Sequence, residues 1–253
     1  MCNNNIANNE NNNNVVNVNN VNNVKLNIDN ISVEVPEGTT ILDAAKKINV
    51  KIPALCKHPD LKASGACGIC IVEIEGAKKF TRSCCNYVKE GMVVKTNTPD
   101  ILNARKVILE LILANHPQDC LICGRSGNCE LQKMADYFGL TNIRFDNISK
   151  SLPKDQSTKA TVFDPSKCIK CGRCVSACED VQGVKAINFV NRGHEVFVDS
   201  AGEESLADST CVKCGQCSAY CPTGAILEYD ETEKTWAGIM DKTKYPVVQI
   251  APA

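Results

Sequence analysis

The sequence predicts an α+β chain built from three small domains, and three observations predict it. Two strand patterns followed by a helix pattern begin near residue 25. Two helix patterns in the middle of the chain enclose a loop with one histidine and three cysteines. A cysteine-rich segment then occurs twice in the last third of the chain. The length of 253 residues leaves room for two or three domains of this kind.

Composition restricts what the chain can do. It holds 17 cysteines, yet residues 1–24 are mostly asparagine and lack the segments of a secretory signal. We therefore expect a cytoplasmic protein with a disordered tail at 1–24, whose thiols bind metal rather than form disulfides. The formal net charge of -1 and the lack of a long apolar run predict neither a nucleic-acid partner nor direct membrane insertion.

The first domain is expected to span 25–98. Strands are predicted at 25–28 and 31–35, joined by a tight turn at 29–30. Thr40 is a candidate cap for the helix that follows. This order of strand, strand and helix resembles the start of the β-grasp fold of plant-type ferredoxins.

Cysteines in this domain form the first candidate metal site. Cys56, Cys67 and Cys70 are followed by a fourth ligand that is either Cys84 or Cys85. Plant-type [2Fe-2S] sites have the spacing C-x4-C-x2-C with a distant fourth cysteine. Ten residues separate the first two cysteines here, so a longer loop must lie over the cluster. Four thiols also suit structural zinc, but the preceding β-grasp pattern favours iron.

The second domain, expected at 99–140, contains two predicted helices. Asp100 is predicted to cap the first helix, which leads to His116. The second helix follows Cys129 and ends at Gly139. The apolar stripe of the first helix is predicted to consist of Ile101, Ala104, Ile108, Leu111 and Ile112.

A cysteine count suggests the ligands of this middle site. Cys120, Cys123 and Cys129 lack a fourth thiol, because the two cysteines left over lie in the asparagine-rich tail and beside an assigned ligand. His116, four residues before Cys120, completes a Cys3His set. Both zinc and an iron-sulfur cluster accept such a set, so the spacing alone does not choose the metal.

The third domain, expected at 163–229 after a linker at 141–162, is an internal duplication. "CIKCGRCVSAC" and "CVKCGQCSAYC" match at every cysteine, 43 residues apart. Each copy has the bacterial ferredoxin spacing C-x2-C-x2-C-x3-C, in which the fourth cysteine ligates the other cluster. Zinc knuckles are the alternative, although zinc rarely needs two such evenly spaced quartets. The predicted ligands are Cys168, Cys171, Cys174 and Cys221 for one [4Fe-4S] cluster, and Cys178, Cys211, Cys214 and Cys217 for the other.

Three longer segments carry a wider resemblance. "NHPQDCLICGRSGNCELQ", "DPSKCIKCGRCVSACEDVQGVKAINF" and "CVKCGQCSAYCPTGAI" resemble the electron-relay region of multi-cluster [FeFe] hydrogenases, over residues 25–253. The arrangement is also similar to part of the large iron-sulfur subunit of respiratory complex I. The resemblance implies that His116 binds a [4Fe-4S] cluster and that Cys84 completes the [2Fe-2S] site. Residues 230–253, with "VVQIAPA", look like the segment that leads into the hydrogenase catalytic domain.

The resemblance also implies a function and its limits. No cysteine follows Cys221, so the ligands of the hydrogenase H-cluster are missing from this chain. We expect an electron carrier with one [2Fe-2S] and three [4Fe-4S] clusters, without catalytic residues or hydrogenase activity of its own. Implied partners are a soluble ferredoxin, an NAD(P)H-oxidising flavoprotein subunit, or a hydrogenase catalytic domain supplied separately. The alternatives are a fragment of a complex I-like NADH dehydrogenase subunit and a zinc-stabilised interaction scaffold.

One surface feature is interpreted separately from the cluster sites. Several lysines lie near the predicted [2Fe-2S] site, and they are interpreted as a solvated charged surface rather than as a docking face. They are Lys46, Lys47, Lys51, Lys57 and Lys62.

Overall fold

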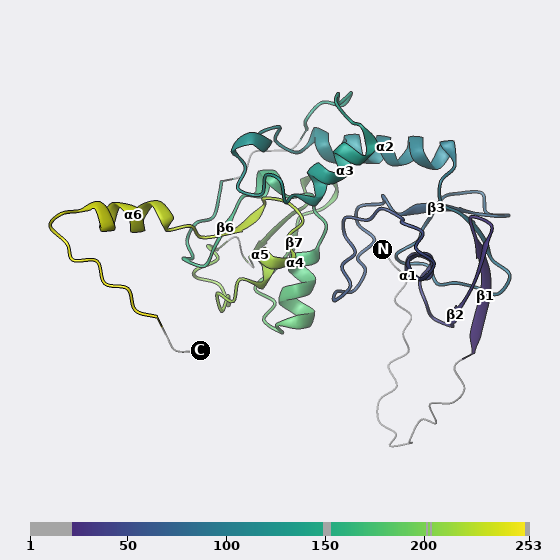
Figure 1. Cartoon of the computed structure of the whole chain (residues 1–253), viewed down its shortest axis with the longest axis horizontal. Coiled ribbons are helices and arrows are strands. Elements are labelled where there is room, and N and C mark those ends of the chain that lie inside the picture. The colour runs from purple at the N-terminus through teal and green to yellow at the C-terminus, as the bar shows by residue number, and fades with distance from the viewer. Residues whose placement is uncertain (1–21, 149–152, 201, 203, 251–253) are drawn as a thin grey trace, which may run out of the picture.

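A five-stranded sheet forms the core of the first domain. The computed structural model describes residues 22–148, 153–200, 202 and 204–250 (Figure 1), and the sheet has the order β2-β1-β5-β3-β4. The first strand pairs antiparallel with the second and parallel with the fifth. This is the β-grasp arrangement, so the expected fold is confirmed. The strands are β1 (Asn23–Ile28), β2 (Ile31–Pro36), β3 (Ile71–Ile74), β4 (Thr81–Arg82) and β5 (Val93–Lys95).

Local sequence explains the hairpin and the helix that follows it. The turn residues Asp29 and Asn30 have φ values of 49° and 68°, a region that Asp and Asn tolerate better than most residues. The Thr40 hydroxyl accepts a hydrogen bond from the N–H of Asp43 at 3.1 Å. It therefore caps α1 (Ile41–Lys47), as predicted.

The first strand begins earlier than expected. Of the tail expected to be disordered, residues 1–21 lie outside the described residues. Asn23 and Val24 belong to β1 instead. Val24 is buried, because the alternation of inward and outward side chains continues back to this position.

The start of α2 (Pro99–Ala114) differs from its prediction. Thr98, rather than Asp100, is the cap, since its hydroxyl accepts from the N–H of Ile101 at 3.3 Å. Pro99 takes the first helical position, where the missing N–H has no intrahelical acceptor. Asp100 lies one residue inside the helix, in the first turn.

The buried face of α2 also differs from the predicted stripe. Leu111 is 47% exposed, whereas Arg105 is only 3% exposed. The Arg105 guanidinium donates to the backbone carbonyls of Ile69 and Ile71, at 3.1 and 2.6 Å. The helix therefore turns this face toward the sheet and joins the first two domains. Its buried residues are Ile101, Arg105, Leu109, Glu110, Leu113 and Ala114.

The middle domain continues from α2 into a loop and a second helix. The loop contains one short 3-10 turn, η1 (Cys120–Ile122). Helix α3 (Glu130–Phe138) follows and ends at Gly139, whose φ of 61° gives the left-handed cap expected for glycine. This part of the fold agrees with the prediction.

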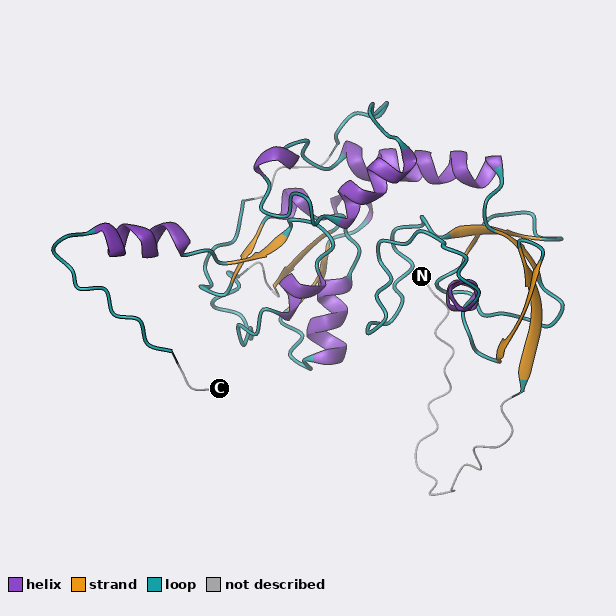
Figure 2. Cartoon of the chain, in the orientation of Figure 1, coloured by secondary structure: helices purple, strands orange, loops and turns teal. Residues whose placement is uncertain are grey.

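The third domain is built around two small two-stranded sheets (Figure 2). One pairs strands from either end of the domain, and the other is a hairpin inserted between the two cysteine runs. The hairpin was not expected from the sequence. The elements are β6 (Thr161–Phe163), η2 (Pro165–Lys167), α4 (Arg173–Ser176), the π-helical turn η3 (Ala177–Val181), β7 (Ile187–Val190), η4 (Gly193–Glu195), β8 (Phe197–Ser200), α5 (Gln216–Tyr220) and β9 (Ile226–Glu228).

The segment that leads into this domain is ordered before the expected boundary at residue 163. The strand β6 already begins at Thr161, and Asp155 exchanges two backbone hydrogen bonds with Phe163, at 2.9 and 2.8 Å. The Asp155 carboxylate also accepts from the N–H of Leu206 at 2.7 Å. The last part of the predicted linker thus packs on the third domain.

A final helix, α6 (Thr232–Met240), extends away from the rest of the chain (Figure 1). None of its residues is buried, and Trp236 is 56% exposed. Among the helices of the described residues, none has the length and apolar character needed to cross a membrane.

The Arg105 contacts generate a stability prediction. Arg105→Met removes two hydrogen bonds and leaves two buried carbonyls unsatisfied, which should lower the free energy of unfolding by about 3 kcal/mol. The apparent melting temperature of the anaerobic protein should fall by roughly 6–12 °C. Lys106→Met, on the exposed side of the same helix, is the matched control and should change stability by less than about 0.5 kcal/mol. Equal melting temperatures for the two variants would contradict the role given to Arg105.

Candidate metal-cluster sites

Four buried thiols of the first domain lie together, three from the segment that precedes β3 and one from the turn after β4. Cys56, Cys67, Cys70 and Cys84 are each at most 8% exposed. Cys56 is hydrogen-bonded to Cys67 and Cys84, and Cys84 also to Cys70. Cys85 is half-buried, with its Sγ 3.4 Å from the Cys84 Sγ. The structure thus brings Cys84 into the group of four.

The hydrogen bonds among these thiols divide them into two kinds. Hydrogen bonds from Cys67 and Cys84 lower the pKa of Cys56, and a hydrogen bond from Cys84 lowers the pKa of Cys70 to about 7. The hydrogen bond with Cys56 raises the pKa of both Cys67 and Cys84. Cys56 and Cys70 therefore lose their protons more readily than Cys67 and Cys84, and thiol ligands must lose them to bind iron.

The second site lies in the loop between α2 and α3. Cys129 is buried, Cys123 is half-buried and Cys120 is exposed. Burial, followed by the charges of Cys123 and Cys120, raises the pKa of the Cys129 thiol. These three predicted ligands are therefore near neighbours.

His116 lies at the edge of the same loop. Burial lowers the pKa of its imidazole, which keeps the ring neutral, and its Nδ1 atom is buried without a hydrogen-bond partner among the described residues. Lys167 lies near His116 and also bonds Cys123 and Asp119, the latter at 2.9 Å. Lys167 thus links the neutral, unpaired imidazole to the loop that carries the three cysteines.

The third domain supplies one wall of this second site. A Cβ atom added to Gly224 would lie 2.6 Å from the Cys123 Sγ, closer than such atoms approach in proteins. Arg125 fixes the wall by donating to the carbonyls of Ser218 and Thr223, at 2.9 and 3.4 Å. The close backbone approach and the unpaired imidazole nitrogen both fit a bound cluster.

The eight cysteines of the duplicated segment form two groups that cross the repeat. One small cavity is lined by Cys168, Cys171, Cys174 and Cys221. Burial and the neighbouring Cys221 raise the pKa of Cys168 to about 11 and of Cys171 to about 12. The fourth cysteine of the second run therefore lies with the first three of the other run.

The other cavity has the reciprocal composition. It is lined by Cys178, Cys211, Cys214 and Cys217. Burial, together with the charges of Cys211, Cys214 and Cys178, raises the pKa of Cys217 to about 11. The two groups match the crossed sets that the spacing predicts.

The duplication is visible in the backbone as well. Lys170 and Lys213, at equivalent positions, have φ values of 55° and 58°. Their N–H groups donate to the Sγ atoms of Cys168 and Cys211, both at 3.4 Å. Glycines two residues further on, with φ values of 78° and 73°, begin the short helices α4 and α5. In each copy of the repeat, a backbone N–H group thus points at a cysteine sulfur. Such contacts influence the potential of a bound cluster.

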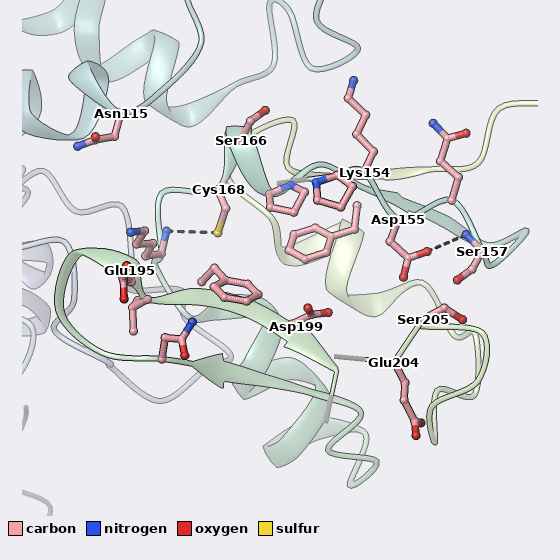
Figure 3. Close-up of a pocket in the computed structure, with 18 of the residues that line it drawn as sticks. Asn115, Lys154, Asp155, Ser157, Ser166, Cys168, Glu195, Asp199, Glu204 and Ser205 are labelled. Carbon is pink, nitrogen blue, oxygen red and sulfur yellow. Dashed lines mark hydrogen bonds between the residues drawn. The ribbon is translucent and has the colours of Figure 1, made fainter. Parts of the chain in front are cut away.

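A pocket of about 910 Å³ opens beside the first of these groups. It lies next to η2 and the β7–β8 hairpin, and Figure 3 shows Cys168 at its wall. Its rim carries charges of both signs, among them Lys154, Asp155 and Glu195. In the described residues, no group of three or more His, Cys, Asp or Glu side chains is arranged to hold a single metal ion.

Three family descriptions match successive parts of the chain. Residues 21–99 match the 2Fe-2S iron-sulfur cluster binding domain, and residues 105–144 match the NADH-ubiquinone oxidoreductase-G iron-sulfur binding region. Residues 167–225 match the 4Fe-4S dicluster domain. This is an iron-sulfur electron-transfer chain.

Relatives of the iron-sulfur chain occur in two kinds of enzyme. It is 42% identical over 234 residues to the NADP-reducing hydrogenase subunit HndD of Solidesulfovibrio fructosivorans, a match over 90% of this chain and 40% of that protein. It is 38% identical over 208 residues to an NADH-quinone oxidoreductase subunit of Rhizobium meliloti strain 1021, covering 81% of this chain and 24% of that protein. The iron-sulfur chain therefore spans less than half of either relative.

A solved structure shares the fold of the iron-sulfur chain. It belongs to a NAD+-reducing [NiFe]-hydrogenase in the H2-reduced state, with a TM-score of 0.75 and 29% sequence identity. The match covers 81% of this chain and 87% of that one. The resemblance to relay regions of hydrogenases and complex I is thus shown.

Sequence reasoning missed several residues around the sites of the iron-sulfur chain. Arg105, Arg125 and Lys167 were not singled out, because their roles depend on segments far away in the sequence. Arg173 had a signal that could have been used: the second copy has Gln216 in its place, although the flanking Gly and Cys are the same.

The close approach at Gly224 generates a prediction for the second site. Gly224→Ala should push the backbone away from Cys123 and remove iron from this site alone, lowering the iron content by about four atoms per chain. Gly238→Ala, in α6 with no atom within 4 Å of the added Cβ, should leave the iron content unchanged. Anaerobic iron and sulfide analysis measures both, and full iron content in Gly224→Ala would refute the predicted clash.

Proposed function

We propose that the chain relays single electrons through one [2Fe-2S] and three [4Fe-4S] clusters. The observation that most supports this proposal is the crossing of the two cysteine groups in the third domain, since each combines three thiols of one run with the last thiol of the other. Crossed ligation is the pattern of two-cluster ferredoxins. No residue is proposed to act as an acid, a base or a nucleophile.

The proposed ligands follow the groups described above. Burial of Cys84 and its hydrogen bonds to Cys56 and Cys70 support it over Cys85. The sets are Cys56, Cys67, Cys70 and Cys84 for [2Fe-2S]; His116, Cys120, Cys123 and Cys129 for one [4Fe-4S]; Cys168, Cys171, Cys174 and Cys221 for the second; and Cys178, Cys211, Cys214 and Cys217 for the third.

The side chains and backbone around the sites would set the cluster potentials. Each bound cluster supplies a reversible one-electron centre. N–H groups of Lys170, Ala186 and Lys213 donate to sulfur atoms at 3.2–3.4 Å, and such donation stabilises the more negative, reduced state. The neutral imidazole of His116 lacks the negative charge of a thiolate, so it should act in the same direction.

Exposure indicates where electrons can enter or leave. Cys120 and Cys214 are the exposed thiols of the described sites. Beside Cys120, the apolar side chains of Leu121 and Ile122 are 98% and 85% exposed. An electron-carrying protein can approach a cluster most closely at such positions.

We propose that the chain serves an NAD(P)-linked hydrogenase in the cytoplasm. The match to the hydrogenase subunit HndD covers more of the chain, at higher identity, than the match to the NADH-quinone oxidoreductase subunit. The proposed partners are a ferredoxin or an NAD(P)H-oxidising flavoprotein subunit, together with a catalytic domain, of the [FeFe] type according to the sequence resemblance. The second candidate is a complex I-like NADH dehydrogenase, supported by the family match at 105–144.

Reconstitution with iron and sulfide tests the proposed cluster content. The anaerobic chain should bind about 14 iron atoms and turn brown, and its reduced form should give EPR signals of both cluster types. Under the same conditions the zinc-scaffold alternative predicts a colourless protein with bound zinc. That outcome would overturn the proposal.

The histidine ligand generates a separate prediction. His116→Cys adds a thiolate and should lower the midpoint potential of that cluster, because the added negative charge disfavours the reduced state. Redox titration followed by EPR measures the change, with the other three clusters as internal controls. An unchanged potential at this site would argue against ligation by His116.

A further inference from the structure

Arg173 is a buried cation at the meeting point of all three domains. Its side chain in α4 is 4% exposed. The guanidinium forms a two-fold ion pair with Glu130, with Nη1–Oε1 at 2.6 Å and Nη2–Oε2 at 2.8 Å. It also donates to the backbone carbonyl of Lys57 at 3.1 Å. One side chain thus joins α4, α3 and the long loop of the first domain.

Each partner of Arg173 lies beside a proposed ligand of a different cluster. Lys57 follows Cys56, and Glu130 follows Cys129. Arg173 itself precedes Cys174. The guanidinium therefore connects chain segments next to three proposed sites, through its ion pair with Glu130 and its hydrogen bond to the Lys57 carbonyl.

The long loop of the first domain makes further contacts with the third domain. The Ser64 hydroxyl donates to the carbonyl of Cys171 at 2.9 Å. Lys62 forms an ion pair with Asp180 at 2.7 Å. The ten residues between Cys56 and Cys67, long for a plant-type site, thus carry the contacts to the third domain (Figure 1).

Two of the lysines interpreted as a solvated surface belong to this junction. Lys57 contributes its carbonyl to Arg173, while its ammonium donates to the carbonyl of Leu61 at 3.1 Å. Lys62 binds Asp180 across the domains. Lys62 remains solvated, with a side chain that is 76% exposed, whereas Lys57 is half-buried in the loop that docks on the third domain.

Comparison of the two copies of the repeat separates this role from cluster binding. Arg173 follows Gly172 in the first copy, and Gln216 follows Gly215 in the second. Both copies gather their cysteines in the same way. A cation at this position is therefore not needed to form a cysteine site, whereas the contacts with Lys57 and Glu130 are particular to Arg173.

We propose that Arg173 is a positioning residue for electron transfer, which holds the [2Fe-2S] site and the His116 site at fixed places relative to the Cys168 site. Arg173 fixes the loop 57–66, which connects the first domain to the third. This inference rests on the proposed function. The guanidinium also places a positive charge near Cys171, which favours the reduced form of the cluster held there.

Variants of the full chain, reconstituted with iron and sulfide, test this role. Arg173→Gln removes the charge and the ion pair, whereas Arg173→Lys keeps a charge but cannot form the two-fold pair. Arg192→Gln removes an exposed arginine from the same domain and is the control. Iron content, EPR of the reduced protein and hydrogen exchange of the loop amides are measured for each.

Both Arg173 variants should keep their iron but show weaker magnetic coupling between the reduced [2Fe-2S] cluster and its neighbours, with faster exchange at 57–66. Only Arg173→Gln should also lower the midpoint potential of the Cys168 cluster. The control should match the parent protein in all three measurements. Coupling and exchange in Arg173→Gln equal to those of the parent would overturn the proposal.

A second variant covers the case in which substitution of Arg173 prevents cluster assembly. The double variant Ser64→Ala with Lys62→Gln removes the other two contacts of the loop and leaves every proposed ligand in place. Faster exchange at 57–66 with weaker coupling supports this connection, and unchanged values overturn it. If the parent protein binds no clusters, the proposed function fails, and loop exchange still decides whether Arg173 locks the junction.

Discussion

Each domain is built around the need to gather four soft donors in one place while keeping backbone N–H groups near them. The third domain meets this need with two copies of one run, in which lysine and glycine residues adopt left-handed backbone conformations before a short helix. Those conformations turn N–H groups toward the sulfur atoms of Cys168 and Cys211. The crossing of the runs then makes each half depend on the other. Each group takes three cysteines from one copy and one from the other.

The same constraint explains why charged residues are buried at the domain contacts. Clusters held by thiolates bring negative charge into the interior, and a buried arginine offsets part of it while bonding backbone carbonyls. Arg105 does this between α2 and the start of β3, on either side of Cys70. Arg173 bonds the Glu130 carboxylate and the Lys57 carbonyl where the three domains meet. In both cases one buried arginine joins separate segments of the chain, two at Arg105 and three at Arg173.

Much of this arrangement could be predicted from the sequence, because it is encoded at short range. Cysteine spacing and its repetition predicted the crossed groups, and the Asp-Asn turn and Thr40 predicted the start of the β-grasp domain. The predicted stripe of α2 was right for the buried Ile101 and for Ile108 and Ile112, which pack on the apolar core, but wrong for the exposed Leu111. It also omitted Arg105, whose burial depends on its bonds to the carbonyls of Ile69 and Ile71. The β7–β8 hairpin was not predicted. The Arg173 junction was not predicted either, because Glu130 and Lys57 are distant from Arg173 in the sequence. The helix α2 begins two residues earlier than predicted, with Thr98 rather than Asp100 as its cap, because Pro99 occupies the first helical position.

Similar chains occur in enzymes with different catalysts, one an [NiFe]-hydrogenase and others NADH-quinone oxidoreductases. A relay can serve each of them, because electron transfer needs fixed and buried redox centres rather than a particular catalytic residue. The loop 57–66 and Arg173 would supply that fixed geometry within this chain, independently of the enzyme to which it is attached.

The number of electrons that the chain accepts tests the central claim most directly. Coulometric reduction of the reconstituted, anaerobic protein counts electrons without reference to any partner. The account predicts about four electrons per chain, one for each cluster, all of them recovered on reoxidation. Uptake of no electrons by a fully folded, metal-loaded chain would contradict it.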